Sequence, residues 1–97
     1  MPQLIASIEG VTFKNITLTK PKTTLGRRPY NDIVFENLVC SGEHCVFYLN
    51  NGEVDIADLG STNGTSVNGR MVQHQQLQHG DVIRVGHTRL VFHEDSS

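Results

Sequence analysis

The chain has 97 residues, which suits one small domain of residues 1–97. Its hydrophobic content of 37% and charged content of 19% are typical of a globular protein and exclude a disordered or membrane-embedded chain. The formal net charge is −2, without the basic excess that most nucleic-acid-binding domains need, so we expect no nucleic-acid partner.

Targeting and redox signals are also missing from the sequence. No apolar run reaches the length of a membrane span, and the start at Met1 lacks the pattern of a signal peptide. The two cysteines, Cys40 and Cys45, make no disulfide framework and have no partner ligands at zinc spacing. We therefore expect a cytoplasmic protein with no membrane partner, no metal and no cofactor.

Short apolar runs follow one another along the whole chain. They are rich in Val, Ile, Leu, Thr and Phe and partly alternate with polar residues, as strands do. The predicted strands are residues 4–8, 11–18, 23–25, 32–35, 45–49, 54–59, 65–67, 71–72, 82–85 and 89–93. No helix is predicted, residues 73–78 are expected to form a polar loop, and residues 94–97 a flexible tail after a core of about residues 3–93. Many short strands at this spacing indicate an antiparallel sandwich or barrel.

Two turns predict local strand pairing. Asn68-Gly69 supplies the two positive-φ positions of a type I′ hairpin between flanking β-type residues. Asn50-Asn51-Gly52 is expected to form a similar hairpin with one more residue in its loop.

Three segments depart from strand-and-turn composition: residues 25–28, 41–44 and 58–65. Each adjoins a strand, and the loops of a sandwich gather at its two ends, so these segments can meet in space. Together they offer one arginine fork, two hydroxyls, an amide and two turn glycines: Arg27, Ser41, Thr62, Asn63, Gly60 and Gly64. A cation among neutral donors, without a general base, is the inventory of a phosphate receptor.

The order of these residues resembles a forkhead-associated (FHA) domain. The matching pattern is Gly26-Arg27, Ser41-x-x-His44, Asp58-Leu59-x-Ser61-x-Asn63-Gly64-Thr65-x-Val67-Asn68-Gly69 and Leu77-x-x-Gly80-Asp81-x-Ile83-x-x-Gly86. The resemblance implies an all-β sandwich of two antiparallel twisted sheets, with about eleven short strands and recognition loops at one end. It also implies a module that binds phosphothreonine peptides in Ser/Thr kinase signalling, prefers them over phosphoserine, and catalyses nothing.

The resemblance also implies a role for each matching residue. Arg27 would hold the phosphate, Ser41 would hydrogen-bond it, and the backbone N–H of Thr62 would donate to it. Asn63 would bind the ligand backbone, and His44 would brace the loops from behind. The phosphopeptide-binding set is Arg27, Ser41, Gly42, Ser61, Thr62 and Asn63; the supporting set is Gly26, His44, Gly64, Asn68 and Gly69.

Some positions leave alternatives open. Gly42 stands where many FHA domains carry a polar side chain, so it can offer a ligand only its backbone. Ser61 could tie its loop together as readily as contact phosphate, and Arg28 is expected to face away from the ligand.

The sequence also bears on functions other than phosphopeptide binding. A hydrolase triad of Ser41, His44 and Asp58 would need a strand–turn–helix context, which this β pattern lacks. A phospho-independent scaffold or oligomerisation domain on the same fold is the main alternative. A third reading joins the two, with self-association through a phosphothreonine on another copy of the parent chain.

Overall fold

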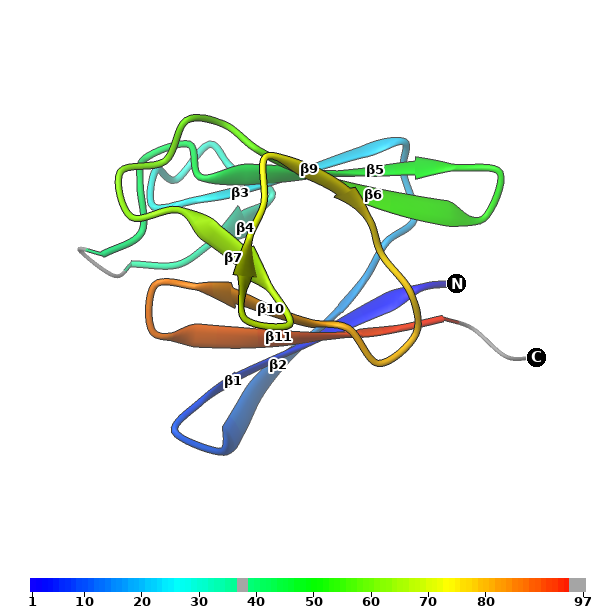
Figure 1. The fold of residues 1–97 in the computed structure, drawn as a ribbon, viewed down its shortest axis with the longest axis horizontal. Helices are drawn as coiled ribbons and strands as arrows, with labels where there is room; N and C mark the ends of the chain where they lie inside the picture. Colours follow the sequence, from blue (N-terminus) through cyan, green and yellow to red (C-terminus); the bar gives the residue numbers. More distant parts are fainter. Residues whose placement is uncertain (37–38, 95–97) are drawn as a thin grey trace.

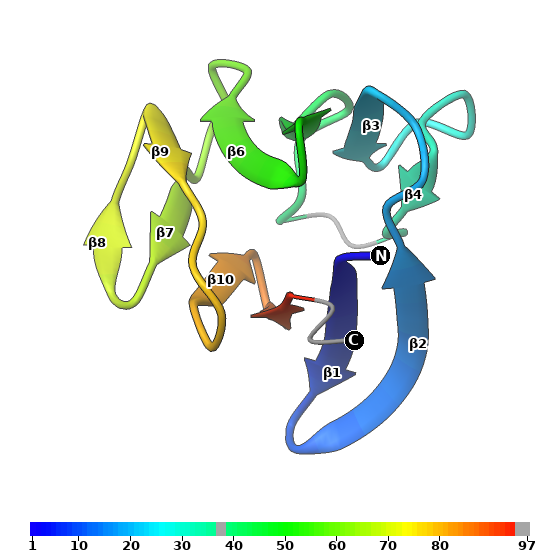
Figure 2. The same cartoon turned by 90° about the vertical axis from the view of Figure 1, so that its right-hand side faces the viewer.

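The computed structural model describes residues 1–36 and 39–94. The predicted tail therefore lies, except for Glu94, outside the described residues. These residues form two facing β-sheets (Figures 1 and 2). The strands are β1 Gln3–Ile8, β2 Val11–Thr17, β3 Lys22–Gly26, β4 Ile33–Val34, β5 Cys45–Asn50, β6 Glu53–Asp58, β7 Thr65–Val67, β8 Arg70–Met71, β9 His74–Gln76, β10 Val82–Val85 and β11 Thr88–His93.

The first sheet has six strands in the order β2-β1-β11-β10-β7-β8, and the second has five in the order β4-β3-β5-β6-β9. Buried side chains that alternate along strands such as β1, β6 and β11 fill the space between the sheets, whereas β2 at the edge of the first sheet is almost entirely exposed. In β1, Leu4 and Ala6 are buried while Gln3 is exposed; in β11, Leu90 and Phe92 are buried while Arg89 is exposed. Both cysteines, free thiols, are also buried. Across the described ranges no helix has the length and hydropathy to cross a membrane.

The Asn68-Gly69 hairpin is confirmed, with φ of 52° and 83° at its two turn residues. The other predicted hairpin differs, because Asn50 pairs with Glu53 and leaves only Asn51-Gly52 in the turn. That turn is therefore two residues long, with φ of 54° and 80°, and has the same positive-φ geometry.

Two further features depart from expectation. Residues 74–76 form β9, which pairs antiparallel with β6 at the edge of the second sheet, inside the stretch predicted as a loop. An edge strand has one free side and tolerates the polar sequence His-Gln-Gln, so it lacks the apolar signature of a strand. The β3–β4 pair is parallel, whereas the other strand pairs among the described residues are antiparallel.

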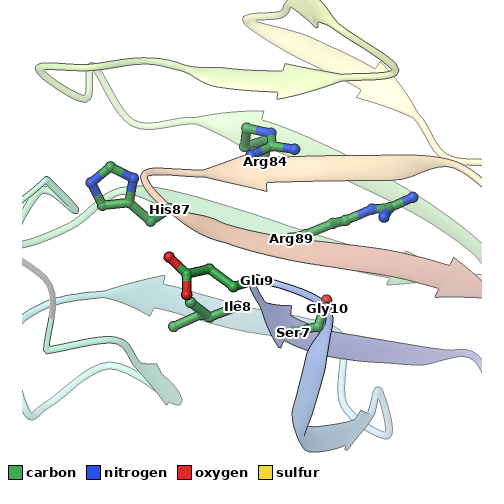
Figure 3. A pocket seen from close by; sticks show the side chains of 7 residues that line it. All are labelled: Ser7, Ile8, Glu9, Gly10, Arg84, His87 and Arg89. Carbon is green, nitrogen blue, oxygen red and sulfur yellow. The ribbon is translucent and has the colours of Figure 1, made fainter.

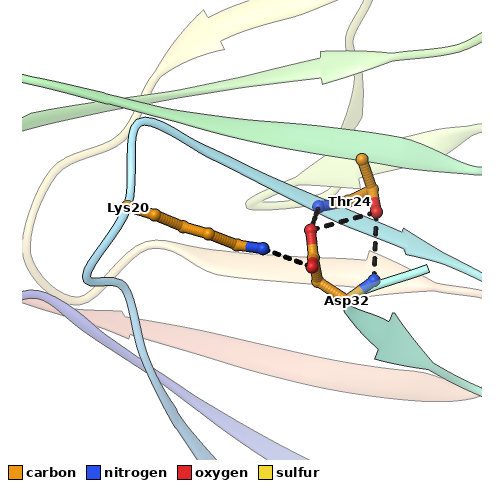
Figure 4. A network of polar contacts seen from close by, with 3 residues as sticks. All are labelled: Lys20, Thr24 and Asp32. Atoms are coloured by element: carbon orange, nitrogen blue, oxygen red, sulfur yellow. Dashed lines mark hydrogen bonds and ion pairs between the residues drawn. The ribbon is translucent and has the colours of Figure 1, made fainter. Parts of the chain in front are cut away.

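A polar cluster stabilises the parallel pair (Figure 4). The Asp32 carboxylate accepts from the backbone N–H and hydroxyl of Thr24, at 2.9 and 3.2 Å, and the Asp32 N–H donates back to that hydroxyl at 3.0 Å. Lys20 forms an ion pair with the same carboxylate. Hydrogen bonds from Lys20 and Thr24 lower the pKa of Asp32, so the cluster favours the charged carboxylate. It fixes where the chain re-enters the sheet after the first loop described below.

Candidate functional site

Three loops lie at one end of the sandwich (Figure 1). The first loop (residues 27–32) joins β3 to β4, the second (residues 35–44) joins β4 to β5, and the third (residues 59–64) joins β6 to β7. Backbone hydrogen bonds connect the first loop to the second: Arg27 N–H donates to the carbonyl of Ser41 at 2.9 Å, and Arg28 N–H to that of Gly42 at 3.2 Å. Segments far apart in sequence therefore form one surface.

Asn31 strengthens the contact between the first two loops. Its buried side-chain amide donates to the carbonyls of Arg28 and Gly42, at 2.9 and 2.8 Å. The close approach requires Gly26, because a methyl group at that position would lie 2.2 Å from the Gly42 oxygen. In the sequence, Asn31 stands just before a predicted strand, in a stretch typical of a turn. Its bridging role depends on a partner eleven residues away.

The buried ring of His44 connects the second loop to the third. Its Nδ1 accepts the backbone N–H of Ser41 at 3.0 Å, so the neutral ring carries its proton on Nε2 and donates it to the Gly64 carbonyl at 2.9 Å. Both nitrogens are thus engaged by the backbone and none faces the Ser41 hydroxyl. This geometry suits a bracing residue and differs from that of a hydrolase triad.

Asp58 organises the third loop from its start. Its carboxylate accepts from the N–H groups of Gly60 and Ser61, both at 3.0 Å, and from the hydroxyls of Ser61 and Thr65, at 2.6 and 2.7 Å. Burial alone would raise the pKa of Asp58, but these hydrogen bonds together lower it, so the carboxylate is charged at neutral pH. The sequence signal was an aspartate followed closely by Ser and Thr, a pattern of side-chain-capped turns.

The Ser61 hydroxyl proton is donated to Asp58, which favours the alternative that Ser61 ties the loop together. Thr62 also forms a contact within the site. Its backbone N–H donates to the Ser41 Oγ at 2.9 Å, so in this structure it is not free for a ligand. Because that Oγ already accepts one bond, its own proton is available for an oxyanion. The Thr62 side chain is exposed at the same place.

Asn63 joins the third loop to the second through a 2.9 Å bond from Nδ2 to the Val39 carbonyl. Its Oδ1 has no hydrogen-bond partner among residues 1–36 and 39–94, so it can still accept from a ligand backbone. A hollow of about 320 Å³ opens along this loop beside Ser61, Thr62 and Asn63.

Two arginines stand on the first loop. Arg27 is exposed, and its guanidinium makes no hydrogen bond or ion pair with the described part of the chain. Burial raises the pKa of the Cys40 thiol, and the positive charge of Arg27 opposes that rise, so this charge acts on the residue that precedes Ser41. Arg28 lies against Gly42: a methyl group on Gly42 would be 3.0 Å from its Cγ and 3.1 Å from its Nε. Arg28 therefore reaches the second loop, although the sequence indicated that it would face away.

The structure shows how Gly64 and the Asn68-Gly69 turn, predicted as supporting residues, contact neighbouring strands. Gly64 has φ of 83°, and an added methyl group would lie 1.8 Å from the Met71 Cε. Asn68, paired with Gly69 in its turn, uses its side chain to bind the β10 end: Nδ2 donates to Asp81 at 2.9 Å, and Oδ1 accepts the Val82 N–H at 3.0 Å. The structure brings the predicted binding residues together at one end of the sandwich. Their roles in binding a ligand remain predictions.

Comparison with known proteins agrees with this fold. The family model of the FHA domain matches residues 23–86. The oxoglutarate dehydrogenase inhibitor of Corynebacterium efficiens is 45% identical over 75 residues, 77% of this chain and 53% of that protein. This chain spans about half the length of the curated relatives it matches.

Two solved structures are similar to this chain over nearly its whole length. The FhaA FHA domain, crystallised with the intracellular domain of Rv3910, is 30% identical with a TM-score of 0.87, covering 95% of this chain and 99% of that one. A structure from a study of phosphothreonine-dependent FHA domain interactions is 27% identical with a TM-score of 0.88, covering 98% and 99%. On the family match, the sequence identity and the shared two-sheet fold, the chain belongs to the FHA domain family.

Proposed function

We propose that this chain is a non-catalytic module that binds phosphothreonine in a partner protein, downstream of a Ser/Thr kinase. The observation that carries the proposal is that the backbone of Arg27, whose guanidinium has no partner among the described residues, is bonded to Ser41, while the Ser41 hydroxyl is bonded to the third loop. The solved FHA domains with this fold include one from a study of phosphothreonine-dependent interactions.

Each part of the proposed site has a chemical task. Arg27 offers a permanently charged planar fork for two phosphate oxygens. The Ser41 hydroxyl, oriented by the Thr62 N–H, donates its own proton to a third oxygen. The carboxamide of Asn63 binds the peptide backbone beside the phosphothreonine, because Oδ1 and one Nδ2 proton remain available.

Arg28 adds a second cation to this site. Its side chain occupies the space above Gly42, the position where a ligand-contacting side chain was expected and is missing. The first loop thus supplies a polar side chain over the position where the second loop has none. Two neighbouring cations favour the phosphate dianion, whose second pKa is about 6.

Isothermal titration with phosphopeptides tests the function. The probe is a peptide selected from a library degenerate around a fixed phosphothreonine, synthesised also with phosphoserine and with unmodified threonine. We expect a dissociation constant on the order of micromolar for phosphothreonine, weaker binding of phosphoserine, and none of threonine. Affinity should fall as the pH drops through about 6. Equal affinity for the unmodified peptide would refute the proposal.

A further inference from the structure

Two arginines lie on neighbouring strands at the outer surface of the six-stranded sheet (Figure 3). Arg84 of β10 pairs in register with Arg89 of β11, and both side chains are exposed. The same cross-strand row continues to Ser7 of β1 on one side and Ser66 of β7 on the other. Residues directly opposite on antiparallel strands share a face, with Cβ atoms about 5 Å apart. The row therefore sets two guanidinium groups between two hydroxyls.

Nothing in the described chain neutralises this pair. Neither guanidinium makes a hydrogen bond or ion pair with residues 1–36 or 39–94. Glu9 also lines the pocket of about 280 Å³ above the sheet. Figure 3 shows its carboxylate at the His87 end, with the Arg89 guanidinium extending away from it. Like charges directly opposite each other destabilise a sheet, so an external anion would offset a real cost.

The pair adjoins the recognition end of the molecule. The turn between β10 and β11 contains Gly86, where an added methyl group would lie 3.4 Å from the Val39 Cβ and 3.7 Å from the Cys40 backbone nitrogen. Those two residues precede Ser41 in the second loop. Arg84 and Arg89 are two and three residues from Gly86, about 7–10 Å along their strands. A protein bound at the loops could thus continue over this turn onto the sheet.

We propose that Arg84, Arg89 and Ser7 form a second binding site, which takes a carboxylate-rich segment of the protein that carries the phosphothreonine. Guanidinium groups match carboxylates in shape and bind them through paired hydrogen bonds. Charge complementarity therefore selects an acidic polypeptide segment as the occupant. The inference rests on the proposed phosphothreonine function for its partner, while the site itself can be measured alone.

The test compares three synthetic peptides at low salt. The first is a library-selected phosphothreonine peptide, and the other two extend it at its C-terminal end by six glutamates or by six glutamines; a second pair extended at the N-terminal end is measured in the same way. For the wild type we expect one glutamate extension to bind about three- to tenfold more tightly than its glutamine counterpart. The R84Q/R89Q double variant should lose this gain and bind the short peptide as the wild type does.

R70Q is the matched control, because Arg70 is an exposed arginine in β8 of the same sheet, and its guanidinium makes no hydrogen bond or ion pair with the described residues. R70Q should still bind the glutamate extension more tightly than its glutamine counterpart. Absence of a gain in the wild type, or a gain that persists in R84Q/R89Q, would overturn the second site.

A separate measurement keeps this outcome distinct from failure of the proposed function. Free hexaglutamate is titrated into the full chain while the arginine Nε–H signals are followed by NMR. Shifts at Arg84 and Arg89 that exceed those at Arg70 support the site even if no phosphopeptide binds. Equal shifts at all three would show non-specific attraction and would contradict it.

Discussion

The side chain of Arg28 lies over the backbone of Gly42, within 3.0 Å of where a Cβ at that position would stand. The contact joins a cation of the first loop to the residue that follows the site serine. It explains why this chain can lack a polar side chain at residue 42: the space is already occupied.

Replacement of Arg28 should weaken phosphothreonine binding without unfolding the domain. We expect R28A to lower the affinity about fivefold, since one exposed cation is lost from the site. G42V should have a similar effect, because its branched side chain needs the space that Arg28 fills. Adding G42V to R28A should then cost little more. Titration of the four proteins measures this coupling, and fully additive losses would show that the two residues act independently.

Gly26 should be the least replaceable of the site glycines. G26A sets a methyl group 2.2 Å from the carbonyl oxygen of Gly42, and we expect it to cost about 3 kcal/mol of unfolding free energy. G52A is the comparison, because Gly52 has φ of 80° with open space around it, so only backbone strain of about 1–2 kcal/mol applies. Urea denaturation of both variants separates the two effects. Equal losses would contradict the steric explanation.

His44 should stabilise both the domain and the position of Ser41. H44A removes a fully buried ring and two hydrogen bonds, and we expect a loss of about 2–4 kcal/mol. The specific readout is amide hydrogen exchange, which should accelerate at Ser41 more than at Leu4 in the distant core. Uniform acceleration at both amides would show a general loss of stability instead of a local brace.

The loss of unfolding free energy at low pH should depend on Asp58. Burial alone would raise its pKa, but the hydrogen bonds it accepts lower that pKa in the folded state below the ordinary 3.8. The folded state therefore binds fewer protons, and its stabilisation is present above about pH 4 and lost as the pH falls through the folded pKa. D58N should be less stable at neutral pH and lose less stability on acidification between about pH 4 and pH 2. An unchanged acid slope would contradict this.

Asp32 is the control for that measurement. Its pKa is also lowered, by hydrogen bonds from Lys20 and Thr24, but its side chain forms none of the hydrogen bonds that organise the third loop. D32N should reduce the acid slope as well, yet leave the amide exchange of Gly60 and Ser61 unchanged, whereas D58N should accelerate it.

Local chemistry predicted the fold wherever a few neighbouring residues decide it. The Asn68-Gly69 turn needs two positive φ values, which those residues adopt readily, and the structure has them. The edge strand β9 was missed because His-Gln-Gln carries no apolar alternation, and its hydrogen bonds come from β6. The parallel β3–β4 pair was missed for a similar reason, since it depends on the non-local cluster around Asp32.

The residues of the candidate site were predicted from a family pattern, but the hydrogen bonds that hold its loops together were not. The meeting of Arg27, Ser41 and Thr62 followed from the order of motifs. The bonds that hold them together come from Asn31 and Asp58, whose partners cannot be read from spacing alone. The course of the Arg28 side chain also depends on the absence of a side chain at Gly42, a relationship between two loops.

The affinity of R27A for the library-selected phosphothreonine peptide tests the central claim most directly. Arg27 would supply paired charge-assisted hydrogen bonds to the phosphate, so R27A should bind at least about 100-fold more weakly than the wild type. R70A, with the same loss of charge, should bind within about twofold of the wild type, and both variants should unfold at the wild-type urea concentration. An R27A protein that keeps wild-type affinity would contradict the account and favour a phospho-independent scaffold.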